Sequence, residues 1–371
     1  MANRVGAPPR PGLERPHLRL SRQAGNRRTR AYMGYLSGAP VRTTTTLPPQ
    51  VAALPAAGLL AALGGPTLFD LRHPGKPPLF VSTLLHGNET SGWDAVRRIA
   101  LSDEAAEFSW MLFLGNVQAA AQGARSLPEQ PDFNRIWHAS ADDDRARPTA
   151  DGGIWQEDGN AHPAEAQLAD AVTQAAKAAR PFFAVDVHNN SGHNPPYSVI
   201  TSLDPTTLAA AAAFSPRAIH ARQPAGVHTR RFARFCPAVT IETGQPEDPQ
   251  SAERAEAYLL DCLRSAEPPA AKHSRLALFE NTIRVTVRGD VEPHPGLERL
   301  NFGVAAPGQC IAHRGELVAE DSQGRIVTDQ YLEADGSATR LTQSVTLSMY
   351  TSDVAIARQD CLCYFMTQVA A

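Results

Sequence analysis

The sequence contains no long apolar run and no marked excess of charge. No stretch of about 18 apolar residues occurs in its 371 residues, so we expect no transmembrane helix. The longest candidate, from Val51 to Leu63, is rich in alanine, interrupted by Pro55 and too short. The N-terminus lacks the apolar core of a signal peptide. A net charge of −3 gives no global basic field, so binding to nucleic acid is not expected.

Cysteines are few and scattered along the chain. Their number is odd, so we expect no disulfide framework and favour a reducing, cytoplasmic location. The C-x-C pair near the C-terminus would place both side chains on one face of a strand, where packing is favoured over metal binding. The five cysteines are Cys236, Cys262, Cys310, Cys361 and Cys363.

Several common catalytic motifs are also missing. The sequence has no G-x-x-x-x-G-K-[ST] loop and no G-x-G-x-x-G after a strand, so a nucleotide-binding role lacks support. It has no G-x-S-x-G motif of the kind that carries a nucleophilic serine.

The first part of the chain has the composition of a disordered tail. Residues 1–32 contain eight arginines and one glutamate, with almost no apolar periodicity. This stretch is either a tail or sequence upstream of the real start, with Met33 as an alternative initiator; a nucleic-acid-binding arm is less favoured. Residues 40–50, rich in proline and threonine, are expected to be extended.

From about residue 50 to 270, short apolar runs alternate with helical patterns. A chain with 43% hydrophobic residues can bury a sizeable core, and strands that alternate with helices predict a mostly parallel sheet covered on both faces. The expected strands are Leu79–Leu85, Trp110–Leu114, Phe182–Val187 and Ala238–Ile241. The expected helices are Ser91–Leu101, Ala161–Arg180 and Ser251–Ser265.

After about residue 273 the pattern changes. Thr282–Arg288 and Ser344–Tyr350 alternate polar and apolar residues, and Gly and Pro separate such stretches. We therefore expect a small, mainly antiparallel β module after the α/β region.

Polar side chains that suit a catalytic metal follow three of the predicted strands. His86 and Glu89 follow the first, His188 the third and Glu242 the fourth. Two histidines and one glutamate form a known ligand set for a catalytic zinc with one open position. An H-x-x-E spacing alone is weak evidence, because chance produces it often. Its place at a strand end strengthens it, since α/β enzymes position their chemistry there.

Further polar residues fit around such a centre. Asp186, two residues before His188, faces the same side of a strand and is able to orient the imidazole; the alternative is a bond to nearby backbone. Glu242 ends a buried strand, either as a proton carrier or in a simple ion pair. Asn134 and Arg135 together form a good carboxylate receptor, although such a pair is usually solvated. Arg125 is a candidate to stabilise an oxyanion.

Taken in order, these motifs resemble the succinylglutamate desuccinylase/aspartoacylase family of the M14 zinc carboxypeptidase superfamily. The resemblance covers roughly residues 75–250 and extends more weakly into the β module through Asn301-Phe302, Gly308 and Ile311-Ala312. The motifs are His86-Gly-Asn-Glu89, Gly115-Asn116, Asp132-Phe-Asn134-Arg135, Asp186-Val-His188-Asn189 and Glu242-Thr-Gly244.

The resemblance implies a fold and a reaction. The fold would be α/β, with a zinc-carboxypeptidase-like, mostly parallel or mixed sheet flanked by helices and a small C-terminal β-rich domain. Residues 1–45 would form the tail and extended segment, 46–272 the catalytic domain and 273–371 the β-rich domain. The reaction would be hydrolysis of an amide, either in an N-acyl amino acid or at the C-terminus of a short peptide.

The resemblance also implies roles for individual residues. His86, Glu89 and His188 would bind one zinc ion per subunit, and Glu242 would be the general acid and base. Asn134 and Arg135 would hold a substrate carboxylate. Arg125 would polarise the scissile carbonyl.

The loop at 189–197 departs from the family pattern, which leaves the acyl group open but not the zinc chemistry. His193 in this loop is interpreted as a surface residue. Two other functions remain to be weighed: a carboxypeptidase that acts on peptides or cell-wall fragments, and a metal-free binding protein on the same fold. A cavity closed by the β module would favour small substrates, whereas an open groove would favour peptides.

Overall fold

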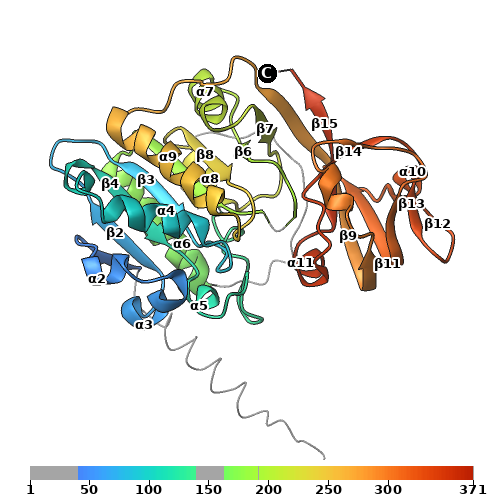
Figure 1. Ribbon diagram of the computed structural model, residues 1–371, viewed down its shortest axis with the longest axis horizontal. Helices are drawn as coiled ribbons and strands as arrows, with labels where there is room; N and C mark the ends of the chain where they lie inside the picture. Colours follow the sequence, from blue (N-terminus) through green and yellow to red (C-terminus); the bar gives the residue numbers. More distant parts are fainter. Residues whose placement is uncertain (1–40, 139–162, 191, 371) are drawn as a thin grey trace, which may run out of the picture. The chain divides into compact units, whose positions relative to one another are not determined.

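A mixed β-sheet flanked by helices organises the chain, as the sequence predicted (Figure 1). The computed structural model describes residues 41–138, 163–190 and 192–370, all of which belong to the unit Gly38–Ala371. The predicted Arg-rich tail lies outside the described residues, apart from the end of its extended segment.

The first eight strands form the N-terminal part of the sheet. Four central neighbours, β4, β3, β5 and β8, run parallel, whereas β2 and β6 are antiparallel to β4 and β8. In spatial order the strands are β1 (Arg42–Thr44), β2 (Thr67–Leu71), β4 (Trp110–Leu114), β3 (Leu79–Thr83), β5 (Phe183–His188), β8 (Ala238–Glu242), β6 (Tyr197–Ile200) and β7 (Arg217–His220).

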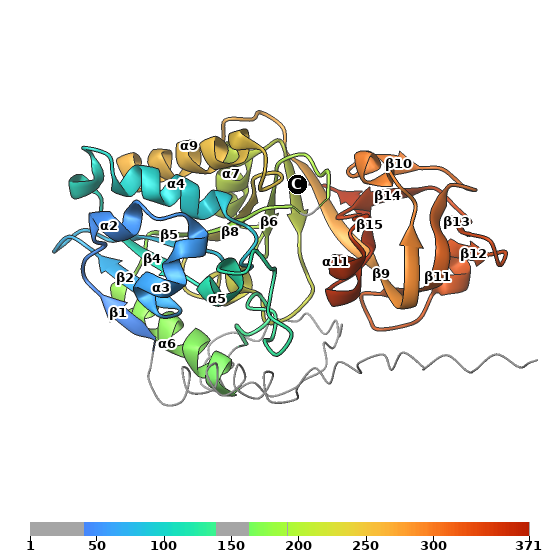
Figure 2. The ribbon, with the colours of Figure 1, turned by 60° about the horizontal axis from the view of Figure 1, so that its bottom comes forward.

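Helices cover both faces of this sheet because alternate residues of each buried strand point to opposite sides. In β3, Leu79 and Val81 join the core under α4 and α9, while Phe80 joins the core under α6 and α8. Figure 2 shows α4 and α9 together on one face and α6 on the other. The first face carries α2 (Pro49–Ala52), α3 (Leu59–Leu63), α4 (Ser91–Ala100), α7 (Pro205–Phe214) and α9 (Pro249–Ser265); the second carries α6 (Pro163–Ala179) and α8 (His228–Phe232).

Some predicted boundaries differ from the structure. Helix α9 begins at Pro249 rather than at Ser251, because the side chain of Asp248 accepts a bond from the backbone N–H of Gln250 at 3.0 Å and caps the helix there. The start of the predicted helix 161–180 lies outside the described residues. Strands β2, β6 and β7 and helices α7 and α8 were not predicted, because most of them are too short to show a period.

The C-terminal β region, residues 277–369, continues the same sheet and has a core of its own. Strand β9 pairs in parallel with β7 and in antiparallel with β11 and β15. Val285, Ile311 and Phe365 lie in the separate core. The remaining elements are β9 (Ala277–Pro293), β10 (Val304–Ala305), β11 (Cys310–Asp321), α10 (Thr328–Tyr331), β12 (Leu332–Ala334), β13 (Thr339–Leu341), β14 (Val345–Ser348), α11 (Val354–Gln359) and β15 (Cys363–Val369).

Two expectations about composition can be compared with the structure. All five cysteines are buried and none forms a disulfide, in agreement with their odd number. Among the helices that the structure describes, none has the length and apolar character needed to cross a membrane.

Candidate metal centre and active site

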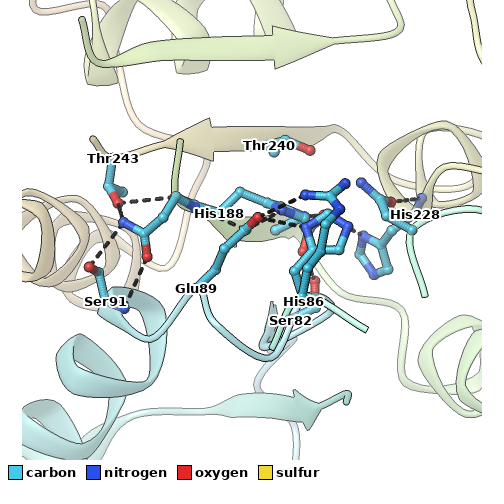
Figure 3. A network of polar contacts seen from close by, with 12 residues as sticks. Ser82, His86, Glu89, Ser91, His188, His228, Thr240 and Thr243 are labelled. Carbon is cyan, nitrogen blue, oxygen red and sulfur yellow. Dashed lines mark hydrogen bonds and ion pairs between the residues drawn. The ribbon is translucent and has the colours of Figure 1, made fainter. Parts of the chain in front are cut away.

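The carboxyl ends of three adjacent parallel strands bring the predicted residues together (Figure 3). His188 is the last residue of β5 and Glu242 the last of β8, and the two are direct partners across the strands. His86 lies three residues beyond the end of β3, which pairs with β5 on its other side. Parallel strands end at the same edge of a sheet, so the three side chains reach one place.

The turn after β3 requires its glycine. Leu84 has a positive φ of 58°, and the chain then passes very close to α5 (Val117–Ala120). A Cβ on Gly87 would lie 2.2 Å from the backbone nitrogen of Ala120, which no side chain tolerates. The glycine between His86 and Glu89 therefore lets both side chains turn toward the same point.

His86, Glu89 and His188 form a buried cluster that fits a metal ion. Their potential ligand atoms all lie within 4.8 Å of one another. Nδ1 of His86 lies 2.7 Å from Oε1 of Glu89, and Nδ1 of His188 lies 2.8 Å from Oε2 of the same carboxylate. Two imidazole nitrogens that converge on one carboxylate are a donor set that zinc accepts.

A second carboxylate contacts the far side of each ring. Nε2 of His188 lies 2.8 Å from Asp186, whose other oxygen accepts a bond from the Ser82 hydroxyl at 2.7 Å. Nε2 of His86 lies 3.0 Å from Asp132, a contact that the sequence did not reveal. Carboxylates in these positions hold the ring proton on Nε2 and leave a lone pair on Nδ1. The orientation of both rings therefore also fits a metal ligand.

The charges in the cluster stabilise one another. Burial lowers the pKa of His188, but Asp186 and Glu89 outweigh it, so the pKa lies well above its usual value. Burial and Arg125 lower the pKa of His86, but Glu89 and Asp132 outweigh them, so this pKa is raised as well. Burial alone would raise the pKa of Glu89, yet the two histidines hold it below its usual value. The pocket is thus suited to a positive charge between these side chains.

A network around Asn189 holds the cluster in place (Figure 3). The backbone N–H of Asn189 donates to Oε2 of Glu89 at 3.0 Å. Its side-chain amide donates to Ser91 and Thr243 at 3.0 Å each and to the carbonyl of Gly244 at 2.8 Å. The network links the start of α4 to the ends of β5 and β8, so the ligands do not depend on a free loop.

Glu242 faces the same cavity with one oxygen uncommitted. Its Oε2 atom is buried and has no hydrogen-bond partner. Burial raises the pKa of Glu242 to about 8; His188 opposes this shift and Glu89 adds to it. A carboxyl group of this kind is suited to exchange a proton near neutral pH.

The predicted arginines and Asn134 also line the cavity. Arg125 contacts Glu89 at 3.3 Å and Asp132 at 3.1 Å. Arg135 lies 3.5 Å from Asp360, a residue of the C-terminal β region. The side-chain oxygen of Asn134 accepts a bond from the backbone N–H of His228 at 3.0 Å, so its amide nitrogen remains the group to present to a ligand.

The cavity is lined by both the N-terminal part of the sheet and the C-terminal β region. It holds about 1000 Å³ of empty space, its open mouth included. His193 does not line it and is exposed, as the interpretation of the 189–197 loop expected. Lining residues from the C-terminal β region are Asn281, Met349, Thr351, Ile356, Asp360, Cys361 and Tyr364.

Three residues at the site had no role predicted from the sequence. Asp132 belongs to the same motif as Asn134 and Arg135, the predicted carboxylate receptor. Its contact with Nε2 of His86 parallels the contact of Asp186 with Nε2 of His188. Tyr197 lines the cavity directly opposite Glu242 on the neighbouring strand. Asp360 lies in no recognisable motif.

Comparisons with known proteins identify the family and the fold. A family model described as the succinylglutamate desuccinylase/aspartoacylase catalytic domain matches residues 76–266. None of the curated proteins matches the sequence. Solved structures of similar fold include succinylglutamate desuccinylase from Vibrio cholerae, with 13% identity and a TM-score of 0.53 over 79% of this chain and 82% of that chain.

Two further structures show the same similarity of fold. A succinylglutamate desuccinylase/aspartoacylase from Rhodobacter sphaeroides has 15% identity and a TM-score of 0.51, with 82% of this chain and 88% of that chain covered. Murine aminoacylase 3 has 17% identity and a TM-score of 0.50, with 80% and 97% covered.

Proposed function

Because the chain belongs to the succinylglutamate desuccinylase/aspartoacylase family, we propose that it is a zinc-dependent amidohydrolase that cleaves the amide bond of a small N-acyl amino acid. The observation that carries this proposal is the buried cluster of His86, Glu89 and His188 beside Glu242, in one cavity. A protein that only binds a ligand has no need for a carboxyl group poised to move a proton.

The three clustered side chains would hold zinc through the Nδ1 atoms of the histidines and the carboxylate of Glu89. Bound there, the ion would supply Lewis acidity toward the scissile carbonyl and the attacking water. Asp132 and Asp186 keep the rings oriented, since each contacts the opposite nitrogen.

Glu242 moves the proton in this proposal. In its ionised form it accepts a proton from water through Oε2 and then passes that proton to the departing amine. Asn134 and Arg135 bind the substrate carboxylate and fix the register of the amide. Arg125, held by Glu89 and Asp132, is assigned to the oxyanion that develops on the carbonyl oxygen.

The make-up of the cavity favours small substrates over long peptides. Met349, Ile356 and Tyr364 from the C-terminal β region line it together with the metal cluster, so both parts of the sheet would contact one ligand. A carboxypeptidase would instead need a groove that continues beyond the cleaved residue. The cytoplasm is the location we propose, since five free cysteines suit a reducing compartment.

The test is a substrate panel with the metal content measured. Purified full-length protein should contain one zinc ion per chain by elemental analysis and hydrolyse N-acyl amino acids faster than dipeptides and longer peptides. Removal of the metal with a chelator should abolish the activity, and added zinc should restore it. Faster cleavage of peptides would favour a carboxypeptidase, and a chain without stoichiometric zinc or turnover would favour a binding protein.

A further inference from the structure

One wall of the cavity carries no charged side chain. We call it the neutral wall; it comes from β6, β7, β8 and α8, and the carboxyl group of Glu242, two residues beyond Thr240, borders it. Half of its residues are aliphatic and the other half are threonines, so hydroxyl groups are its only side-chain hydrogen-bonding groups. The residues are Val199, Thr201, Ile219, Ala221, Thr229 and Thr240.

The neutral wall adjoins the proposed carboxylate receptor. Asn134 is held by the backbone N–H of His228, and the neighbours of His228 in sequence, Val227 and Thr229, both line the cavity. The hydroxyls of Thr229 and Thr240 bond to each other, so this part of the wall is fixed. In an amino acid the carboxylate and the side chain share one carbon, so the side chain of a substrate bound at Asn134 is within reach of this wall.

The cations that line the cavity are already engaged. Among the described lining residues these are Arg125 and Arg135, besides the metal-cluster histidines. Arg125 contacts Glu89 and Asp132 and lies 3.6 Å from Asp360. Arg135 also contacts Asp360. Since Arg135 is assigned to the substrate carboxylate and Arg125 to the oxyanion, no lining arginine remains for a second carboxylate, and a buried carboxylate without a cationic partner is strongly disfavoured.

Buried polar atoms beside this wall have no partner in the protein. They are the hydroxyls of Tyr197 and Thr201 and the amide nitrogen of Asn190, all of residues that line the cavity. Buried polar atoms normally find a hydrogen bond, so unpartnered ones on a cavity surface are available to a ligand. All three can donate to the carbonyl of an amide side chain, but being uncharged they supply no positive charge to neutralise a buried carboxylate.

We infer that the substrate is an N-acyl derivative of an amino acid with a neutral side chain, rather than of aspartate or glutamate. The inference rests on the proposed function, because that function places an amino acid carboxylate at Asn134 and Arg135. It assigns the choice of amino acid to the neutral wall, with Thr201 at its hydrogen-bonding end.

The test compares amides and acids of equal size. N-acetylglutamine and N-acetylglutamate, and the corresponding N-propionyl pair, should differ about 100-fold or more in kcat/KM in favour of glutamine, since the acid leaves a side-chain carboxylate unpaired. Thr201→Arg should reverse or erase the difference, whereas Thr201→Met, of similar length and uncharged, should keep it. Equal or faster cleavage of the glutamate compounds overturns the inference and leaves the proposed hydrolysis standing.

A binding measurement separates this inference from the proposed function. Calorimetric titration of the full-length Glu242→Gln protein with both ligands should give tighter binding of N-acetylglutamine by a similar factor. If the wild type cleaves neither compound while this preference in binding persists, the proposed hydrolysis fails and the inference survives. If the acid binds as tightly, or if neither ligand binds and neither is cleaved, the inference is wrong.

Discussion

The metal end of the cavity and the neutral wall differ in how their polar atoms are satisfied. At the metal end each imidazole nitrogen of His86 and His188 lies within 3.0 Å of a carboxylate oxygen. Beside the neutral wall the hydroxyls of Tyr197 and Thr201 have no protein partner. The contacts of the fold organise the first region, whereas the second has polar atoms left for a ligand. We propose that the first region sets the reaction and the second selects the substrate.

The largest effect is expected at Glu242, where the metal end meets the substrate. Glu242→Gln keeps the size and polarity of the side chain but removes the proton carrier, so kcat should fall by about 100- to 10,000-fold. Zinc content and thermal stability serve as controls and should stay near the wild-type values, because Glu242 is not a ligand of the cluster. A variant with full activity would remove Glu242 from the mechanism.

Arg135 tests the carboxylate receptor. Arg135→Ala should raise KM by about 10- to 100-fold for an N-acyl amino acid, since charge-assisted hydrogen bonds are lost. The same substrate with its carboxylate converted to an amide provides the control and should lose little. An equal rise in KM for both compounds would show that Arg135 does not recognise the carboxylate.

A substitution at Asp132 tests whether the carboxylates that contact Nε2 of the histidines strengthen metal binding. Asp132→Asn should weaken zinc binding by about 10- to 100-fold, because His86 loses the charge on its Nε2 side. Asp360→Asn is the matched control: Asp360 also contacts Arg125 but has no contact with His86. Competition with a chelator measures both affinities. Equal affinities in the two variants would contradict the role of Asp132.

Neither ring nitrogen of His228 has a hydrogen-bond partner, in contrast to those of His86 and His188. Burial lowers its pKa to about 4, although Asp186 opposes the shift, so the folded state holds it neutral. Below the usual pKa of 6.5 the unfolded chain takes up a proton that the folded chain refuses. Stability should therefore fall between pH 6.5 and about 4, by at most about 1.4 kcal/mol per pH unit from this group.

Replacing His228 isolates that contribution. His228→Phe keeps an aromatic ring between Phe80 and Phe232 and removes the titrating group. Urea unfolding of both proteins across this pH range should show a shallower acid dependence for the variant. Parallel curves would mean that His228 is already protonated in the folded protein.

The smallest effect is expected from a pair of tyrosines that differ in their hydroxyl partners. The hydroxyl of Tyr350 donates to the carbonyl of Ile311 at 2.7 Å and lies 3.1 Å from that of His294, whereas the hydroxyl of Tyr197 has no partner. Tyr350→Phe should lower the free energy of unfolding by about 1–2 kcal/mol and Tyr197→Phe by less than about 0.5 kcal/mol. Similar losses would mean that Tyr197 is satisfied within the fold.

Much of the N-terminal part of the sheet was predictable because its central strands are continuous apolar runs. Strands β3, β4, β5 and β8 are buried on both faces and end in polar motifs, so local sequence marks both their extent and their edge. Strands β6 and β7 have four residues each, too few to show a period. The antiparallel direction of β6 depends on pairing with β8, which no local pattern encodes.

The candidate site likewise contains residues that the sequence could predict and residues that it could not. His86, Glu89 and His188 could be recognised from their motif and from their places at strand ends. Asp360 could not, because it approaches Arg125 and Arg135 only through the packing of residues more than 200 positions apart. The neutral wall was also hidden, since its members belong to no motif and come together only where three strands and a helix meet.

Strand β9 has a consequence for any attempt to divide this protein. Its first residues, from Ala277 to Glu280, pair with β7, and its later residues carry β11. A shortened chain that stopped before Ala277 would leave β7 as an open edge with unpaired amides and carbonyls. Such an edge invites pairing with another molecule, so the shortened protein would tend to self-associate rather than remain an isolated catalytic unit.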